Sequence, residues 1–90
     1  MGIKYTRLKY DGFESHLKIE KRLFDGWHWQ FEFENGWVVS VIKHRYSYGG
    51  KDDLFESMQY KKQGFCEGEV FGGMRNNEVL KLLRITQALR

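Results

Sequence analysis

The residue types that could bind a metal or act as a nucleophile are few in this chain and widely spaced. The three histidines, His16, His28 and His44, stand at no metal-ligand spacing to one another or to the single cysteine, Cys66. Cys66 has no histidine beside it that would activate it, so a buried structural thiol is favoured over a nucleophile. These residues predict no metal and no other cofactor.

Two other patterns resemble catalytic or phosphate-binding motifs only superficially. Glu32 and Glu34 share the polar face of a predicted strand, about 6.6 Å apart by strand rise, which is similar to the carboxylate separation of glycosidases. Two solvated charges on a strand are the favoured interpretation. The pairs Gly49-Gly50 and Gly72-Gly73 lack the GxxxxGK[ST] frame of a phosphate-binding loop. We therefore expect that the chain is not an enzyme.

A more informative cluster is the stretch HRYSYGGK at residues 44–51, which combines aromatic and basic residues in a predicted surface loop. Tyr and Arg are enriched at protein interfaces and at their hot spots. Arg45, Tyr46, Tyr48 and Lys51 are accordingly the candidate partner-binding residues. The competing interpretation is that Tyr46 or Tyr48 simply closes one end of the core.

Composition limits the remaining classes. The 90 residues include 15 basic and 12 acidic ones, for a net charge of +3, whereas a nucleic-acid binder usually shows a clustered basic face. Nucleic acid is the alternative partner, contacted through Arg45, Lys51, Lys61 and Lys62. One cysteine forms no internal disulfide, which indicates a reducing compartment. No window approaches the roughly 18 apolar residues of a membrane span, so no membrane partner is expected.

The element that organises the chain is a hairpin around Asn35-Gly36. This dipeptide is typical of a two-residue type I′ turn, which needs positive φ at both positions. Residues 31–34 lead into the turn and residues 37–41 lead out of it.

The strand before the turn alternates strictly. Trp27, Trp29, Phe31 and Phe33 point one way and polar residues point the other. This aromatic row could be a stacking platform for bases, but core is favoured because the domain has few other residues large enough to fill it. The third strand, residues 37–44, has apolar residues on both faces, so we place it centrally with something packed over its second face.

The other elements are predicted with less specific signals. Residues 1–15 form a short strand or a loosely held arm, and residues 16–24 a half-buried edge strand, with Leu17, Ile19 and Leu23 on one face; a helix is the competing interpretation. Asp25-Gly26 is the next turn. Residues 45–53 form a loop and residues 54–61 a fourth strand, with Leu54, Met58 and Tyr60 on one face.

Beyond a turn at Gln63-Gly64, Phe65-Cys66 is a predicted fifth strand and residues 69–73 a connection. A helix capped at Asn76-Asn77 follows. Its apolar residues recur at helical spacing: Val79, Leu82, Leu83, Thr86 and Leu89. The helix should dock on the second apolar face of the third strand, and the last dozen residues should form a lid over the aromatic row. The predicted fold is α+β: one domain, residues 1–90, with a four- to five-stranded antiparallel meander and the C-terminal helix packed on one face.

The stretch FENGWVVSVIKHRYSYGGKDDLFE, residues 33–56, resembles a recurrent pattern in small proteins of tailed bacteriophages and prophages. The pattern runs FENG, an aromatic residue, SV, an aromatic residue before SYGG, and finally L-aromatic-E. The matching residues are Phe33, Glu34, Asn35, Gly36, Trp37, Ser40, Val41, Tyr46, Ser47, Tyr48, Gly49, Gly50, Leu54, Phe55 and Glu56. Residues 69–72 and 78–83 are similar to the family's ending, whereas residues 63–68 replace its acidic segment and Arg75 replaces its Thr cap.

The resemblance covers residues 31–89 and implies a phage-encoded protein in the host cell cytoplasm, with no particular reaction. Together with the lack of a catalytic pattern, it leads us to expect a small interaction protein that binds and inhibits a host protein or complex. A bacterial defence system, such as a nuclease or an RNA-guided complex, is the expected target. The alternative is a nucleic-acid-binding accessory protein. The sequence does not predict an oligomeric state.

Overall fold

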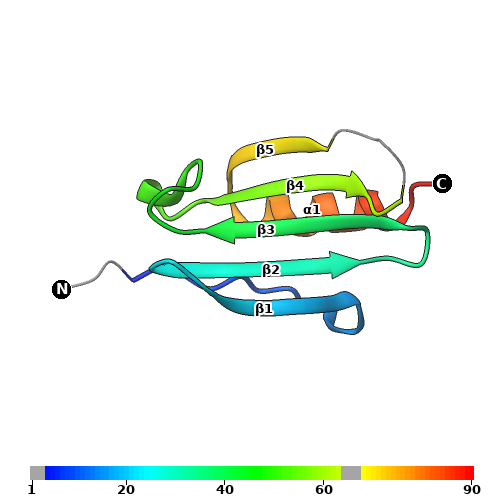
Figure 1. Cartoon of the computed structure of the whole chain (residues 1–90), viewed down its shortest axis with the longest axis horizontal. Helices are drawn as coiled ribbons and strands as arrows, with labels where there is room; N and C mark the ends of the chain where they lie inside the picture. Colours follow the sequence, from blue (N-terminus) through cyan, green and yellow to red (C-terminus); the bar gives the residue numbers. More distant parts are fainter. Residues whose placement is uncertain (1–3, 64–67) are drawn as a thin grey trace.

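The computed structural model describes residues 4–63 and 68–90, which form one antiparallel sheet and a C-terminal helix (Figure 1). The sheet has five strands in the order β1-β2-β3-β4-β5. Their bounds are β1 (Leu17–Leu23), β2 (Gly26–Glu32), β3 (Trp37–Lys43), β4 (Phe55–Lys61) and β5 (Glu69–Met74), and the helix α1 spans Asn76–Gln87. The predicted α+β meander is confirmed.

The aromatic row of β2 is core, as predicted. Trp29 and Phe31 are fully buried and Phe33 is 6% exposed, while Trp27 is half-buried against the same cluster. Val39 and Val41 of β3 pair with Phe31 and Trp29 across the strands, so they share that face. The row is therefore not an open stacking platform.

The helix covers the aromatic row, as the predicted lid requires, but it does not dock on the second apolar face of the third strand. Val79, Leu82 and Leu83 pack into the same cluster as the aromatic row, so α1 covers the face of β3 that carries Val39 and Val41. Val38 and Ile42 point to the opposite face, beside Glu32 and His28 of β2. The prediction placed α1 on that second face of β3 because it assumed that a strand with apolar residues on both faces must be covered on both.

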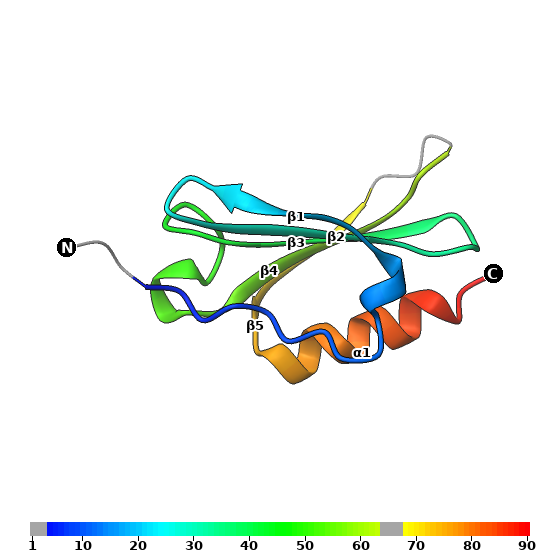
Figure 2. The same cartoon turned by 90° about the horizontal axis from the view of Figure 1, so that it is seen from below.

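The N-terminal segment supplies the other half of the cover. It runs beneath the sheet beside α1 (Figure 2). The predicted alternatives for this segment were a short strand or a loosely held arm. Residues 4–13 contain no strand, yet Tyr5, Leu8 and Phe13 are buried. Lys9 and Asn76 exchange two hydrogen bonds of 2.8 Å each between backbone and side-chain amide. The lid over the core therefore has two parts, and only α1 was anticipated.

A bulge in β1 changes the predicted face of that edge strand. Leu17 pairs with Phe31, but Ile19 pairs with Gln30, so the register shifts between them. Because alternation restarts after a bulge, Leu17 faces the core whereas Ile19 and Leu23 face the other way. The predicted single apolar face is wrong, although the edge position is confirmed.

The C-terminal half also differs from its prediction. The segment predicted as a connection, residues 69–73, lies in the fifth strand, β5, which spans Glu69–Met74. The strand predicted at Phe65-Cys66, and the buried thiol at Cys66, lie outside the described residues. In β4 the core residue is Phe55, at 3% exposure, whereas Met58 on the alternate face is 40% exposed.

The β2–β3 turn is a three-residue loop, not the predicted type I′ turn. The Phe33 N–H donates to the Trp37 carbonyl and the Gly36 N–H to the Phe33 carbonyl, both at 3.0 Å. Gly36 has φ of 87°, and Asn35 is not among the positive-φ residues, as in a type I turn followed by a glycine bulge. The Asn35 amide donates to the carbonyls of Thr86, Gln87 and Leu89 at 2.7 to 3.2 Å. Asn35 thus caps the C-terminus of α1.

The N-cap of α1 is not the predicted Asn76-Asn77 pair. Its N-cap is Arg75, and Asn76 lies inside the first turn, where its side chain binds Lys9. The Glu78 carboxylate accepts a 2.8 Å hydrogen bond from the Arg75 N–H. Val79, Leu82, Leu83 and Thr86 are buried, as the periodicity predicted. Within the described part of the chain, no helix is long and apolar enough to cross a membrane.

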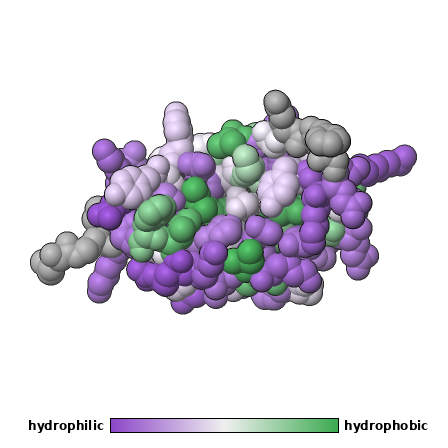
Figure 3. Space-filling view, viewed as in Figure 1, coloured by the Kyte–Doolittle hydropathy of each residue, from purple (hydrophilic) through white to green (hydrophobic). Residues whose placement is uncertain are grey.

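The sheet face opposite α1 carries no helix in the described chain. Figure 3 views this face, where hydrophobic and hydrophilic surface alternates rather than forming one apolar patch. Across β2, β3 and β4, Gln30, Ser40 and Met58 form one row on it. The alternation explains why this face is stable in contact with solvent.

Candidate functional site

The predicted contact loop joins β3 to β4 and is held in place by its own hydrogen bonds. The Ser47 hydroxyl accepts from the His44 N–H at 2.9 Å and donates to the His44 carbonyl at 2.8 Å. The short 3₁₀ helix η2, Gly50–Asp52, completes the loop. His44 and Ser47 are both buried, so the loop has a fixed base although its tip is exposed.

Glycines bring this loop against β5. Gly49 has φ of 91°, and a Cβ added there would lie 2.9 Å from the Gly73 Cα. A Cβ added at Gly72 would overlap the ring of Tyr48. Tyr48 therefore lies on Gly72, while its ring stays 72% exposed. Close approach is the physical reason for glycine at these positions.

The turn between β1 and β2 lies beside this loop and contributes an aromatic ring. Phe24 contacts the ring of His44 at 4.9 Å and that of Tyr46 at 5.1 Å between centroids, with interplanar angles of 61° and 82°. The Arg45 guanidinium lies 5.0 Å from the Tyr46 ring centroid. We call Phe24, His44, Arg45 and Tyr46 the aromatic cluster. Phe24 is 64% and Tyr46 67% exposed.

Phe24 occupies an unfavourable backbone conformation. Its φ is 53°, a value that glycine adopts readily and a bulky residue rarely. The sequence suggested Asp25-Gly26 as the turn, but Leu23 pairs with Gly26, so the two loop residues are Phe24 and Asp25. Gly26 is needed inside the strand instead, because a Cβ there would overlap the Lys43 carbonyl oxygen.

Beneath the cluster, a buried lysine joins three segments. Lys43 is 1% exposed, and its Nζ donates to the Thr6 carbonyl at 2.9 Å and to Asp53 Oδ1 at 3.0 Å. The ammonium also lies 3.6 Å from the centroid of the Phe55 ring. Burial lowers the pKa of Lys43, and the Asp53 carboxylate partly opposes this shift. The network ties the N-terminal segment and the residue after η2 to the end of β3.

The structure brings together only some of the predicted site residues. Arg45 and Tyr46 stack on each other, Tyr48 lies at the β5 side of the same loop, and Lys51 is exposed in η2. Phe24 was missed, because a phenylalanine beside a predicted turn carries no signal in the sequence that it forms the tip.

The basic residues of the nucleic-acid alternative do not share one surface. Lys61 pairs with Trp37 at the far end of β3, about 20 Å from the loop that carries Arg45 and Lys51, by strand rise. Lys62 forms a 2.7 Å salt bridge with Glu32. A continuous basic track through all four predicted residues is therefore absent from the described residues.

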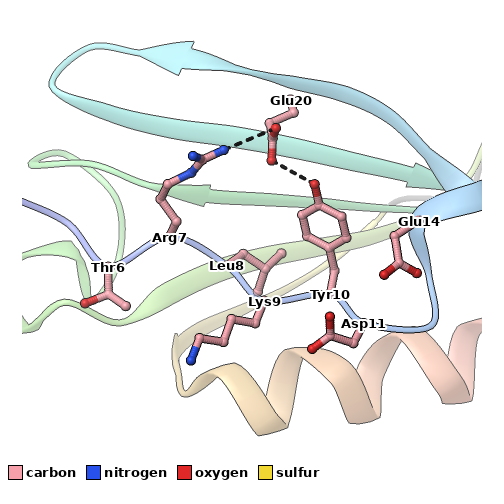
Figure 4. A pocket seen from close by; sticks show the side chains of 8 residues that line it. All are labelled: Thr6, Arg7, Leu8, Lys9, Tyr10, Asp11, Glu14 and Glu20. Atoms are coloured by element: carbon pink, nitrogen blue, oxygen red, sulfur yellow. Dashed lines mark hydrogen bonds and ion pairs between the residues drawn. The ribbon is translucent and has the colours of Figure 1, made fainter.

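A surface depression, separate from the aromatic cluster, lies between the N-terminal segment and β1 (Figure 4). Arg7 and Tyr10 both point at Glu20, whose carboxylate lies 3.3 Å from the Arg7 guanidinium and accepts a 3.0 Å bond from the Tyr10 hydroxyl. Trp29 Nε1 donates to the same carboxylate at 3.0 Å. Burial and the Glu20 carboxylate raise the pKa of Tyr10. With these groups paired to one another, the depression is a structural contact.

The other side chains that were considered for catalysis or metal binding either have structural partners or do not form a common site. His28 Nε2 lies 2.8 Å from the Ser40 hydroxyl, and burial lowers the pKa of His28. Glu32 binds Lys62 and Gln30, while Glu34 is exposed. Residues 4–63 and 68–90 contain no group of three or more His, Cys, Asp or Glu side chains that could hold a metal ion.

Comparisons of the chain with models of known protein families, with curated proteins and with solved structures gave no match. The aromatic cluster is therefore judged on its geometry and chemistry.

Proposed function

We propose that this chain is a phage-encoded interaction protein that binds and inhibits a host protein, and that the aromatic cluster is its contact surface. The phage origin, the site of action in the host cytoplasm and a bacterial defence system as target are suggested by the resemblance in residues 31–89. The observation that supports a binding surface is Phe24, a large ring that is 64% exposed at positive φ.

Phe24 has a backbone cost that its limited burial offsets only in part. A non-glycine residue in a sparsely populated backbone region costs of order 1–3 kcal/mol. A ring that is mostly exposed regains little of that through burial. Glycine would remove the strain, so phenylalanine at this position favours a role outside the fold. Contact with a partner is such a role, because aromatic rings and arginine supply most hot-spot energy.

The cluster is also arranged to bind at a low entropic cost. Phe24 and Tyr46 pack edge to face, and Arg45 lies over Tyr46. Side chains that are already ordered by mutual contact lose little freedom when a partner arrives. The buried Lys43 network holds the loop from below.

The test is an affinity purification from bacterial lysate with the wild-type chain and three variants. We expect one stoichiometric partner with wild type, and its loss with Phe24→Gly and with Tyr46→Ala. Ile85→Ala is the matched control, because Ile85 is also an exposed apolar residue, at 49%, but lies on α1. It should retain the partner.

A partner that is lost with Ile85→Ala but kept with Phe24→Gly would place the contact surface on α1 and refute the aromatic cluster. If the wild-type chain captures no stoichiometric protein and instead binds labelled oligonucleotides at low salt, with affinity that falls steeply as salt rises, the nucleic-acid alternative replaces this proposal.

A further inference from the structure

Two arginines in or beside the aromatic cluster have no carboxylate partner among the described residues, whereas three carboxylates nearby are hydrogen-bonded. Arg22 and Arg45 both flank the β1–β2 turn: Arg22 Nη2 donates to the Asp25 carbonyl at 3.2 Å, and the Arg45 N–H donates to Asp25 Oδ1 at 3.0 Å. Both side chains are exposed. In the part of the chain that the structure describes, neither guanidinium forms a salt bridge.

Three carboxylates near the cluster, in contrast, are occupied. Asp25 accepts from the Tyr5 hydroxyl at 3.1 Å as well as from the Arg45 backbone. Burial opposes its charge, but these hydrogen bonds outweigh burial and lower the pKa of the Asp25 carboxyl. Asp53 binds Lys43, and Glu56 accepts a 2.6 Å bond from the Tyr48 N–H. The guanidiniums of Arg22 and Arg45 are therefore available to an external ligand.

Both guanidiniums are already positioned on aromatic rings. Arg22 lies 4.8 Å from the centroid of the Trp27 ring, and Arg45 lies 5.0 Å from that of Tyr46. Stacking of this kind orders the planar group. Apart from the Nη2 donor that Arg22 uses on the Asp25 carbonyl, the N–H donors remain free, and such donors match a carboxylate in bidentate fashion.

The ring geometry favours a protein over a nucleic acid. Base-binding surfaces present open ring faces on which successive bases stack. Here Phe24 meets Tyr46 at 82° and His44 at 61°, and Arg45 covers Tyr46. These rings present edges and a shallow apolar contact, which suit a side chain rather than a base.

We propose that the aromatic cluster binds an acidic segment of a partner protein, in which carboxylates pair with Arg22 and Arg45 and a large apolar side chain packs on Phe24 and Tyr46. This inference rests on the proposed function, since it specifies the chemistry of the partner at the same surface.

The experiment is a selection of random 12-residue peptides displayed on phage against the immobilised full chain. We expect enrichment of Asp and Glu beside an aromatic or aliphatic residue. Enriched peptides are then synthesised with a fluorophore, and their Kd is measured by anisotropy. The double variant R22E/R45E should weaken binding by about 30-fold or more, since it replaces two attractive charges by repulsive ones.

The matched control is the double variant K81E/R84E, which makes the same charge change on the exposed side of α1. It should leave the Kd of the peptides within about twofold, because surface charges beyond a Debye length are screened. Thermal unfolding of both double variants checks that each is folded before binding is compared.

Enriched peptides without carboxylates, whose binding is nevertheless lost with Phe24→Gly, would overturn the acidic partner and leave the proposed contact surface intact. Peptides that are indifferent to both Phe24→Gly and R22E/R45E, or no enrichment at all, would overturn the inference and the contact surface together. Tighter binding of a fluorescent oligo-dT than of any peptide, lost in R22E/R45E, would identify a nucleic acid instead.

Discussion

The two ends of the sheet use the same kinds of residue in opposite ways. At the β2–β3 turn, the Asn35 side chain donates to three carbonyls at and just beyond the C-terminus of α1, and Lys62 is paired with Glu32. At the other end, Phe24 is exposed in a strained turn and Arg22 and Arg45 lack a carboxylate partner among the described residues. Asn-Gly and Asp-Gly look equivalent as turn signals, yet one turn serves the fold and the other exposes a surface.

The contrast between these two turns shows which side chains are free to bind a ligand. A polar group that already satisfies buried or terminal backbone groups cannot change without loss of stability. An exposed ring or an unpaired guanidinium can be substituted with little loss of stability. Four substitutions test this division, and they are ordered by the size of the expected effect.

Gly26→Ala should have the largest effect. Its Cβ would overlap the Lys43 carbonyl oxygen and lie 2.9 Å from the His44 Cα, so β2 and β3 must separate beneath the aromatic cluster. We expect a loss of about 3 kcal/mol or more in unfolding free energy, measured by urea denaturation. Gly12→Ala is the control: it has φ of 94° but open space around the Cβ, and should lose only about 1 kcal/mol. Equal losses would show that the close approach is unimportant.

Asp53→Asn comes next, because it removes the partner of buried Lys43 while keeping the side-chain shape. Breaking a buried pair typically costs about 3–5 kcal/mol; we expect about 2 kcal/mol at pH 7, since the Asp53 side chain is 44% exposed and solvent screens the pair. Asparagine also tolerates the φ of 59° at this position.

The pH dependence of this variant has a definite sign. Burial raises the pKa of Asp53, but hydrogen bonds from Thr6 and Lys43 outweigh burial, so the pKa lies below its ordinary value of 3.8. The carboxylate thus stabilises the fold above about pH 4, and this contribution is lost as the pH falls through the lowered pKa. The stability difference between wild type and Asp53→Asn should shrink below about pH 4. A difference that is constant down to acid unfolding would mean that the ion pair is not its cause.

Asn35→Ala should lose about 1–2 kcal/mol, because the last carbonyls of α1 lose their donors. Asn35→Asp sharpens the test: it keeps an acceptor for the Trp37 N–H but has no amide donors and places negative charge at a helix C-terminus. We expect Asn35→Asp to be at least as unstable as Asn35→Ala by thermal unfolding. If either variant is as stable as wild type, Asn35 does not stabilise the C-terminus of α1.

Phe24→Gly should have the smallest effect on stability, and with the opposite sign. Relief of the strained φ offsets the extra freedom of glycine in the unfolded chain. We expect an unfolding free energy that is unchanged or up to about 1 kcal/mol higher, measured by urea denaturation. A loss of more than about 1 kcal/mol would show that Phe24 closes the end of the core, and the contrast between the two ends would disappear.

The elements that the sequence predicted well are those whose pattern is local. Trp29, Phe31 and Phe33 alternate with polar residues, and Val79, Leu82 and Leu83 recur at helical spacing, so their burial follows from periodicity alone. In the candidate site, local composition indicated Arg45 and Tyr46. It could not indicate Phe24, because that ring reaches the site through the pairing of β1 with β2.

Hydrophobic periodicity, which acts over a few neighbouring residues, was therefore enough to specify the antiparallel meander, its buried aromatic row and the amphipathic helix. Packing settled which of two faces α1 covers, that residues 4–13 complete the lid, and that Gly26 lies against Lys43 and leaves Phe24 at the tip of the turn. These outcomes depend on contacts between segments distant along the chain, where the space left by one element selects the residue of another.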